Sequence, residues 1–110
     1  MSNDKVLLLH VPNSIAKYGE HLMWFFEGML IKLDKNSHKT TPTSKDIPAI
    51  IEDLREEVIE FEEQLALNKF DENTLIELMD AANFAFLAYV ALRLQGVEHE
   101  RKTKTPPLGL

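Results

Sequence analysis

The stretch Leu54–Asn83, LREEVIEFEEQLALNKFDENTLIELMDAAN, decides how the rest of the chain folds around it. Both ends have strong helix patterns, and a short acidic, turn-like segment separates them. Each predicted helix carries two carboxylates three residues apart, namely Glu57 and Glu60 in the first and Glu77 and Asp80 in the second. Residues three apart share one face of a helix, so two neighbouring helices can direct four carboxylates at one point. This spacing predicts a cation site.

The second of these helices is apolar on all sides between Leu78 and Leu92, except at Asp80 and Asn83. A helix of this kind is expected to be buried. An unpaired buried carboxylate is costly, so Asp80 is expected to be neutralised, to pair or to bind a metal. A bond from Asp80 to a neighbouring Lys, Arg or Tyr is the alternative to a metal ligand. For Asn83 the alternative to a binding role is an interhelical hydrogen bond.

The first helix has an apolar stripe with an acidic row along one flank. The stripe consists of Ile47, Ile50, Ile51, Leu54, Val58, Phe61 and Leu65. At roughly 100° per residue, the row consists of Asp53, Glu57, Glu60 and Gln64, with Glu57 nearest the core. An acidic row by itself is typical of a solvated helix face. Its pairing with the second helix is what favours a binding site.

Composition indicates one soluble domain of 110 residues, near the size at which oligomerisation adds much of the burial. The absence of cysteine excludes disulfides and thiolate metal sites. The apolar run Val6–Leu9 is too short for a signal-peptide core or a membrane span, so a cytoplasmic protein without membrane contact is expected. A net charge of −6, concentrated in the first acidic helix, disfavours nucleic-acid binding.

Local signals place three helices along the chain. The first starts at Ser14 or Tyr18 and ends near Asp34, with an apolar stripe formed by Leu22, Phe25, Phe26, Met29, Leu30 and Leu33. The second starts between Ser44 and Pro48, with Ser44 or Asp46 as the cap, and ends near Asn68. The third is capped by Asp71 or Asn73 and ends at Gln95 and Gly96.

The expected fold is therefore all-α, a bundle of three main antiparallel helices per chain that is completed by oligomerisation. The single domain 1–110 divides into an N-terminal arm (1–17), a helical core (18–96) and a C-terminal tail (97–110). Val6–Val11 is either a short strand or an apolar arm, and the tail ends in PPLGL, which cannot continue a helix. The aromatic residues expected in the core are Trp24, Phe25, Phe26, Phe84 and Phe86.

The two acidic motifs, EEVIE at residues 56–60 and ELMD at residues 77–80, resemble those of the MazG-like, all-α nucleoside triphosphate pyrophosphohydrolases. LIKLDKNSHK at residues 30–39 and DAANFA at residues 80–85 also look like segments of compact, often phage-type members of that family. The resemblance covers roughly residues 25–94. It implies an Mg²⁺-dependent enzyme, with Mn²⁺ as a possible substitute, that cleaves a (d)NTP to a (d)NMP and pyrophosphate.

Carried over by position, the resemblance implies that Glu57, Glu60, Glu77 and Asp80 ligate Mg²⁺, which prefers hard oxygen ligands. The bound metal would clamp the triphosphate and lower the pKa of an attacking water. Glu56 matches the first Glu of the family motif, and a water-orienting role is expected for it beside Glu57 and Glu60.

The substrate would also need donors for its phosphate oxygens. The candidates are Lys32, His38 and Lys39 at the end of the first helix, with Arg93 and the tail residues Lys102 and Lys104 behind them. Asn83, one turn beyond Asp80, is expected to hydrogen-bond the nucleotide sugar or a metal-bound water. His38 is equally typical of an ordinary exposed histidine, and the tail lysines of a solubilising segment.

Family members often have a further helix after the ELMD helix, whereas 14 residues follow Gly96 here. A homodimer or homotetramer, in which a neighbouring subunit supplies the missing wall, is therefore expected. A di-iron bundle is disfavoured because no histidine follows these glutamates at three residues. The main alternative is a non-catalytic helical interaction protein, which would show an exposed apolar patch and carboxylates that do not converge.

Overall fold

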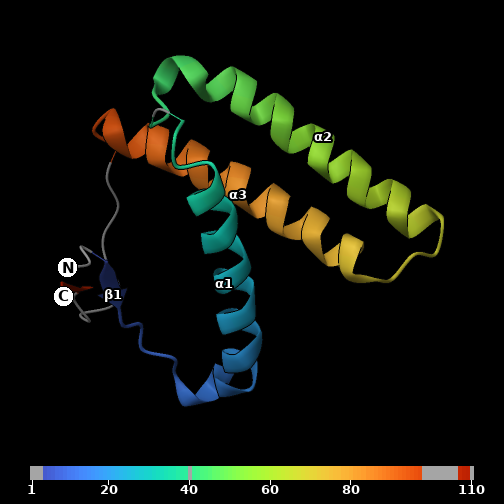
Figure 1. Cartoon of the computed structure of the whole chain (residues 1–110), viewed down its shortest axis with the longest axis horizontal. Coiled ribbons are helices and arrows are strands. Elements are labelled where there is room, and N and C mark those ends of the chain that lie inside the picture. Colours follow the sequence, from blue (N-terminus) through green and yellow to red (C-terminus); the bar gives the residue numbers. More distant parts are fainter. Residues whose placement is uncertain (1–3, 40, 98–106, 110) are drawn as a thin grey trace.

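The computed structural model describes residues 4–39, 41–97 and 107–109, and the chain is mostly helical, with three helices that pack together (Figure 1). The three helices are α1 (Gly19–Lys35), α2 (Ile47–Ala66) and α3 (Glu72–Leu94). Two short 3-10 helices, η1 (Asn13–Tyr18) and η2 (Ser44–Asp46), precede α1 and α2. Two three-residue strands, β1 (Lys5–Leu7) and β2 (Pro107–Gly109), complete the described elements.

The helix ends lie close to the predicted ones because their signals are local. Asp71 caps α3, since its Oδ1 accepts a hydrogen bond from the backbone N–H of Thr74 at 3.2 Å. Gly96 follows α3 with a φ of 98°, a conformation that favours glycine after a helix. Asp46, one of the two predicted caps, is the N-cap residue of α2, and its side chain accepts a hydrogen bond from the backbone N–H of Thr43 in the capping box of η2.

Helices α2 and α3 lie side by side and form the main packing unit (Figure 1). They are joined by a short connection that contains Asn68, a non-glycine residue with a positive φ of 54°. Ile50 on α2 and Ala91 on α3 are the buried apolar residues of the described chain. The connection therefore brings the acidic row of α2 next to the polar residues of α3.

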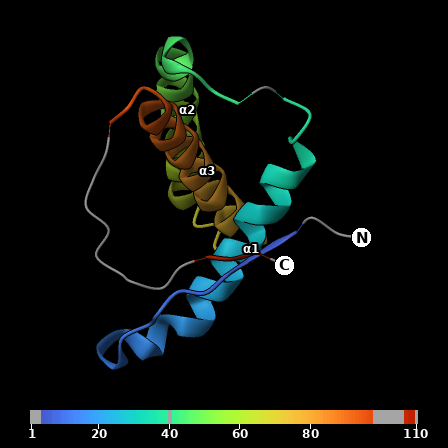
Figure 2. The same ribbon diagram turned by 90° about the vertical axis from the view of Figure 1, so that its left-hand side faces the viewer.

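Helix α1 crosses α3, and within the described part of the chain its backbone packs near α3 and not near α2 (Figures 1 and 2). Gly28 lies at this crossing, where a Cβ atom would overlap Sδ of Met79. The missing side chain therefore lets α1 approach α3 closely. This approach brings the last turn of α1 to the middle of α3.

The N-terminal segment forms a strand, one of the two alternatives that its sequence leaves open. β1 pairs with β2 in an antiparallel two-stranded sheet, with Lys5 opposite Gly109, Val6 opposite Leu108 and Leu7 opposite Pro107. The PPLGL ending thus supplies a strand (Figure 2). The predicted phosphate contacts Lys102 and Lys104 lie outside the described residues.

The prediction that α3 is buried is wrong for the single chain. Only Thr74, Asn83 and Ala91 are buried on it. The aromatic side chains of Trp24, Phe26 and Phe86, which were expected in the core, are exposed by 40% or more. One helix, α3, is long and apolar enough to cross a membrane by length and composition alone. The physical reason for its exposure is that α1 and α2 cover only part of its circumference.

Candidate metal centre and adjoining cleft

Three of the four predicted carboxylates converge between α2 and α3. Glu57, Glu60 and Glu77 each offer an oxygen atom, and these three atoms lie within 4.8 Å of one another. Glu57 and Glu60 share a face of α2 because they are three residues apart. Glu77 approaches them because α3 packs alongside α2.

Two oxygens of this acidic cluster, Glu57 Oε2 and Glu77 Oε2, are buried and have no hydrogen-bond partner among the described residues. An ionised carboxylate only accepts hydrogen bonds, so neighbouring carboxylates cannot satisfy one another unless a proton is shared. Leaving such oxygens unsatisfied is costly. A proton or a cation between the two carboxyl groups removes that cost.

The pKa values of the clustered carboxyl groups also show that their ionisation is disfavoured. The pKa of Glu57 is raised from 4.5 to about 7, first by burial and then by the neighbouring carboxyls of Glu77, Glu60 and Asp80. The pKa of Glu60 is also raised, mainly by its contact with the Glu77 carboxyl. Like charges close together disfavour ionisation, whereas a bound cation favours it. The donor set is oxygen only, which fits Mg²⁺ or Mn²⁺.

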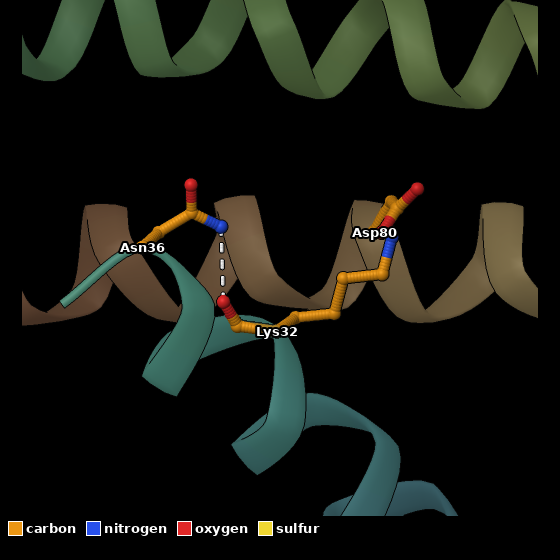
Figure 3. Close-up of polar contacts among 3 residues, drawn as sticks. All are labelled: Lys32, Asn36 and Asp80. Carbon is orange, nitrogen blue, oxygen red and sulfur yellow. Dashed lines mark hydrogen bonds and ion pairs between the residues drawn. The ribbon is translucent and has the colours of Figure 1, made fainter.

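Asp80 lies beside the cluster but has a different partner. Its Oδ1 is 2.7 Å from Nζ of Lys32, so α3 and α1 are joined by an ion pair (Figure 3). This contact is the alternative that the sequence left open for Asp80, a bond to a neighbouring lysine. Asp80 is close enough to Glu57 to raise its pKa. Asp80 was predicted as a metal ligand and Lys32 as a phosphate contact, and the structure pairs these two side chains with each other.

The end of α1 holds Lys32 in place. The side-chain Nδ2 of Asn36 donates a hydrogen bond to the backbone oxygen of Lys32 at 2.9 Å (Figure 3). The backbone N–H of Asn36 lies 3.2 Å from the same oxygen and from that of Leu33. Asn36 thus satisfies carbonyl groups that a helix end leaves without intrahelical partners. No role was predicted for Asn36, although an Asn just after a helix is a known stop signal.

A cleft of about 960 Å³ adjoins the acidic cluster. Glu57 and Asp80 line it and therefore connect the cleft with the carboxylates. Three predicted substrate-binding residues, Lys32, Lys39 and Asn83, line it as well. Asn83 is buried, and its Oδ1 has no hydrogen-bond partner among the described residues.

The cleft is lined by both apolar and polar residues. Helix α3 contributes the apolar lining residues Phe84, Phe86, Leu87 and Val90. Asp46 and Asp53 also line the cleft. No binding role was predicted for them, although Asp53 stands one turn before Glu57 in the same acidic row.

Two predicted site residues stand apart from this arrangement. Glu56 is exposed on α2 and belongs to neither the acidic cluster nor the cleft lining. His38 is exposed in the turn after α1 and does not line the cleft, although its neighbour Lys39 does. Adjacent residues on a helix or turn point in different directions, so a motif can place one residue at a site and the next outside it.

Comparisons of the chain with protein-family models, with curated proteins and with solved structures gave no match. The geometry of the acidic cluster and the cleft therefore carries the functional argument.

Proposed function

We propose that the protein is an Mg²⁺-dependent nucleotide pyrophosphohydrolase that cleaves a (d)NTP to a (d)NMP and pyrophosphate. The observation that carries the proposal is the convergence of Glu57, Glu60 and Glu77 beside a cleft with basic residues. Carboxylates alone would repel a triphosphate, but a divalent cation held by them reverses that local charge. The order of the EEVIE and ELMD motifs, which resembles MazG-like enzymes, supports the same reading.

The donor set suits a hard divalent cation. Glu57, Glu60 and Glu77 would hold it, and Asp80 would join them when Lys32 moves away from its carboxylate. The ion would supply Lewis acidity for the phosphate oxygens and a lower pKa for a bound water. No water-orienting role is proposed for Glu56, because it is exposed and lies outside both the acidic cluster and the cleft lining.

The cleft suits a nucleotide in size and chemistry. Its volume of about 960 Å³ lies in the range of small-molecule sites, roughly 300–1,000 Å³. Lys32 and Lys39 would donate to phosphate oxygens, as Lys side chains commonly do. Phe84 and Phe86, which line the cleft, would contact the base, and the buried Oδ1 of Asn83 would accept a hydrogen bond from the sugar or from a metal-bound water. His38 would join the phosphate contacts from the rim.

We further propose that the protein acts in the cytoplasm as a homodimer or homotetramer, in which the helices form an antiparallel bundle completed by a second chain. The exposed apolar side chains of α1 and α3 support this assembly.

A second candidate function is a non-catalytic helical interaction protein. The observation in its favour is the exposure of large apolar side chains on α1, including Met23, Trp24 and Ile31. The converging carboxylates argue for the enzyme instead, because an interaction protein gains nothing from unsatisfied buried acids.

The test is pyrophosphate release from the eight common NTPs and dNTPs, measured with Mg²⁺, with Mn²⁺ and with EDTA. Release from at least one nucleotide, lost in EDTA and in a Glu60→Gln variant, is the expected result. Glu62→Gln is the matched control, because Glu62 is an exposed residue of α2 outside the acidic cluster. No release from any nucleotide, nor from diphosphates, would reject the enzyme in favour of the interaction protein.

A further inference from the structure

Helix α3 carries an apolar row on the side opposite Asn83 and Ala91. This outer row of α3 consists of Leu75, Leu78, Ala82, Ala85, Tyr89 and Leu92. Its spacing alternates three and four residues, which is the spacing of helices that pack lengthwise against another helix. The four large side chains in the row are 40% to 62% exposed.

The single chain exposes more surface and has a larger radius of gyration than a compact monomer of its mass. It exposes 9190 Å², whereas a compact monomer of 12.6 kDa exposes roughly 6,200 Å². Its radius of gyration is 16.0 Å, against about 13 Å for a compact domain of this length. The exposed N-terminal segment accounts for part of this excess. An obligate interface buries about 2,000–5,000 Å² in total, or about 1,000–2,500 Å² from each partner, so part of the excess of roughly 3,000 Å² per chain is enough for it.

We propose that a second copy of this chain packs on the outer row, with the two α3 helices antiparallel about a two-fold axis between Ala82 and Ala85. The row has the same spacing when read from either end. Under this axis Leu75 lies opposite Leu92 of the partner subunit, Leu78 opposite Tyr89 of the partner subunit and Ala82 opposite Ala85 of the partner subunit. Small residues at the centre allow a close approach, and larger ones at the ends fill the space between the diverging helices.

The charges at the two ends of α3 favour the antiparallel arrangement. Asp71 and Glu72 stand at the N-terminal end, and Arg93 stands at the C-terminal end beside Leu92. An antiparallel pair brings each arginine to the acids of the other copy, whereas a parallel pair brings like charges together. Within the row itself the side chains carry no charge.

A lipid surface is the competing occupant, because α3 has the length and hydropathy of a membrane span. Glu77 and Asp80 lie in the same helix, and ionisable groups in a lipid-embedded helix are costly. Both take part in contacts with α2 or α1. The second copy covers the outer row and leaves these contacts in place.

The first test is the sedimentation of the full chain in detergent-free buffer. The wild type is expected to sediment as a dimer or an even multiple of 12.6 kDa. Ala85→Glu buries a carboxylate at the axis and is expected to raise the dissociation constant by about 100-fold or more. Ile59→Glu is the matched control, since Ile59 is exposed on α2, away from the row, and it should leave the assembly unchanged. Circular dichroism checks that both variants keep their helices.

Cysteine cross-linking tests whether the two α3 helices are antiparallel. The chain has no cysteine of its own, so only the introduced thiols can form disulfides. Leu75→Cys and Leu92→Cys chains are unfolded together, refolded and oxidised. Antiparallel α3 helices predict a disulfide-linked dimer of the two different variants. Neither variant should link to itself, since like positions then lie about 26 Å apart.

Three results would overturn the proposal. Disulfides within each variant alone would indicate a parallel pair. A monomeric wild type, or an Ala85→Glu variant that assembles like the wild type, would remove the outer row as an interface. Flotation of the wild type with neutral phosphatidylcholine vesicles, combined with a monomer in buffer, would assign the row to lipid. The inference rests on the homodimer or homotetramer proposed above. None of these readouts depends on hydrolysis, so failure of the interface and failure of the proposed hydrolysis are distinguished.

Discussion

Lys32 and Asp80 form an ion pair between α1 and α3, with Nζ of the lysine 2.7 Å from Oδ1 of the aspartate (Figure 3). The pair stands where the acidic cluster meets the cleft, because both residues line the cleft and Asp80 acts on the pKa of Glu57. Lys32 thus supplies positive charge beside the carboxylates. A divalent cation would compete with it for Asp80.

Replacing Lys32 tests that competition. Lys32→Ala is expected to raise the KM for nucleotide by about 10-fold or more, because a charged phosphate contact is lost. The affinity of the Lys32→Ala variant for Mn²⁺ or Mg²⁺ should be unchanged or somewhat higher, since Asp80 no longer pairs with a lysine. Steady-state kinetics and calorimetric metal titration measure the two effects. Lys35→Ala, in the same last turn of α1, is the control and should change neither. Unchanged kinetics in Lys32→Ala would remove this lysine from the site.

Neutralising a carboxylate separates catalysis from stability. Glu60→Gln and Asp80→Asn are each expected to abolish hydrolysis while leaving the fold intact. Glu60→Gln should slightly raise the stability of the metal-free protein, because like charges in the cluster repel one another. Thermal unfolding in EDTA and pyrophosphate release with Mg²⁺ are measured on the same preparations. Full activity in either variant would contradict the site assignment.

The raised pKa of Glu57 predicts a pH dependence of stability. The pKa is about 7 in the folded chain and 4.5 as the ordinary value, so the folded state binds more protons between these limits. The stabilisation is therefore present at low pH and is lost as the pH rises through 7. The free energy of unfolding in EDTA should fall by about 1 kcal/mol between pH 5 and pH 8, after allowance for solvent screening.

Two controls accompany that measurement. Mg²⁺ at pH 8 should restore the lost stability, because a cation that binds only the folded state adds its binding free energy. Glu57→Gln should make the unfolding free energy less dependent on pH, since the titrating group is gone. A stability that rises between pH 5 and pH 8 in EDTA, and that responds in the same way in Glu57→Gln, would refute the role of Glu57.

The crossing of α1 and α3 depends on Gly28. Gly28→Val places a branched side chain against Met79 and is expected to lower the unfolding free energy by about 1–3 kcal/mol. Met79→Ala in the same chain should recover part of the loss, and this coupling identifies the contact. Gly19→Val is the control, since nothing lies within 4 Å of a Cβ at Gly19. Equal losses at the two glycines would remove the contact with Met79 as the cause.

Local signals account for the part of the fold that the sequence predicted. Asp71 was one of two predicted caps for α3, and its side chain does bond the N–H of Thr74. The i, i+3 spacing of Glu57 and Glu60 placed both on one face of α2, and a short connection brought Glu77 alongside. These features depend on neighbours within a few residues or on one tight turn between two helices.

The rest depended on how α1 meets α3. Lys32 is 48 positions from Asp80 in the chain, and no periodicity links the two. The exposure of Trp24 and Phe26 could not be predicted either, because their pattern suits a core whether or not another helix covers it. Amphipathic spacing indicates which residues share a helix face. It does not indicate which element, if any, packs against that face.

The sequence by itself determined the three helices, their ends and the acidic faces of α2 and α3, because capping, proline and helical spacing act over a few residues. The tertiary structure alone decided that Asp80 pairs with Lys32, that Glu56 stays outside the cluster, and that one side of α3 is left open. Those outcomes depend on the relative placement of whole helices, which is set by packing at positions such as Gly28 and Met79.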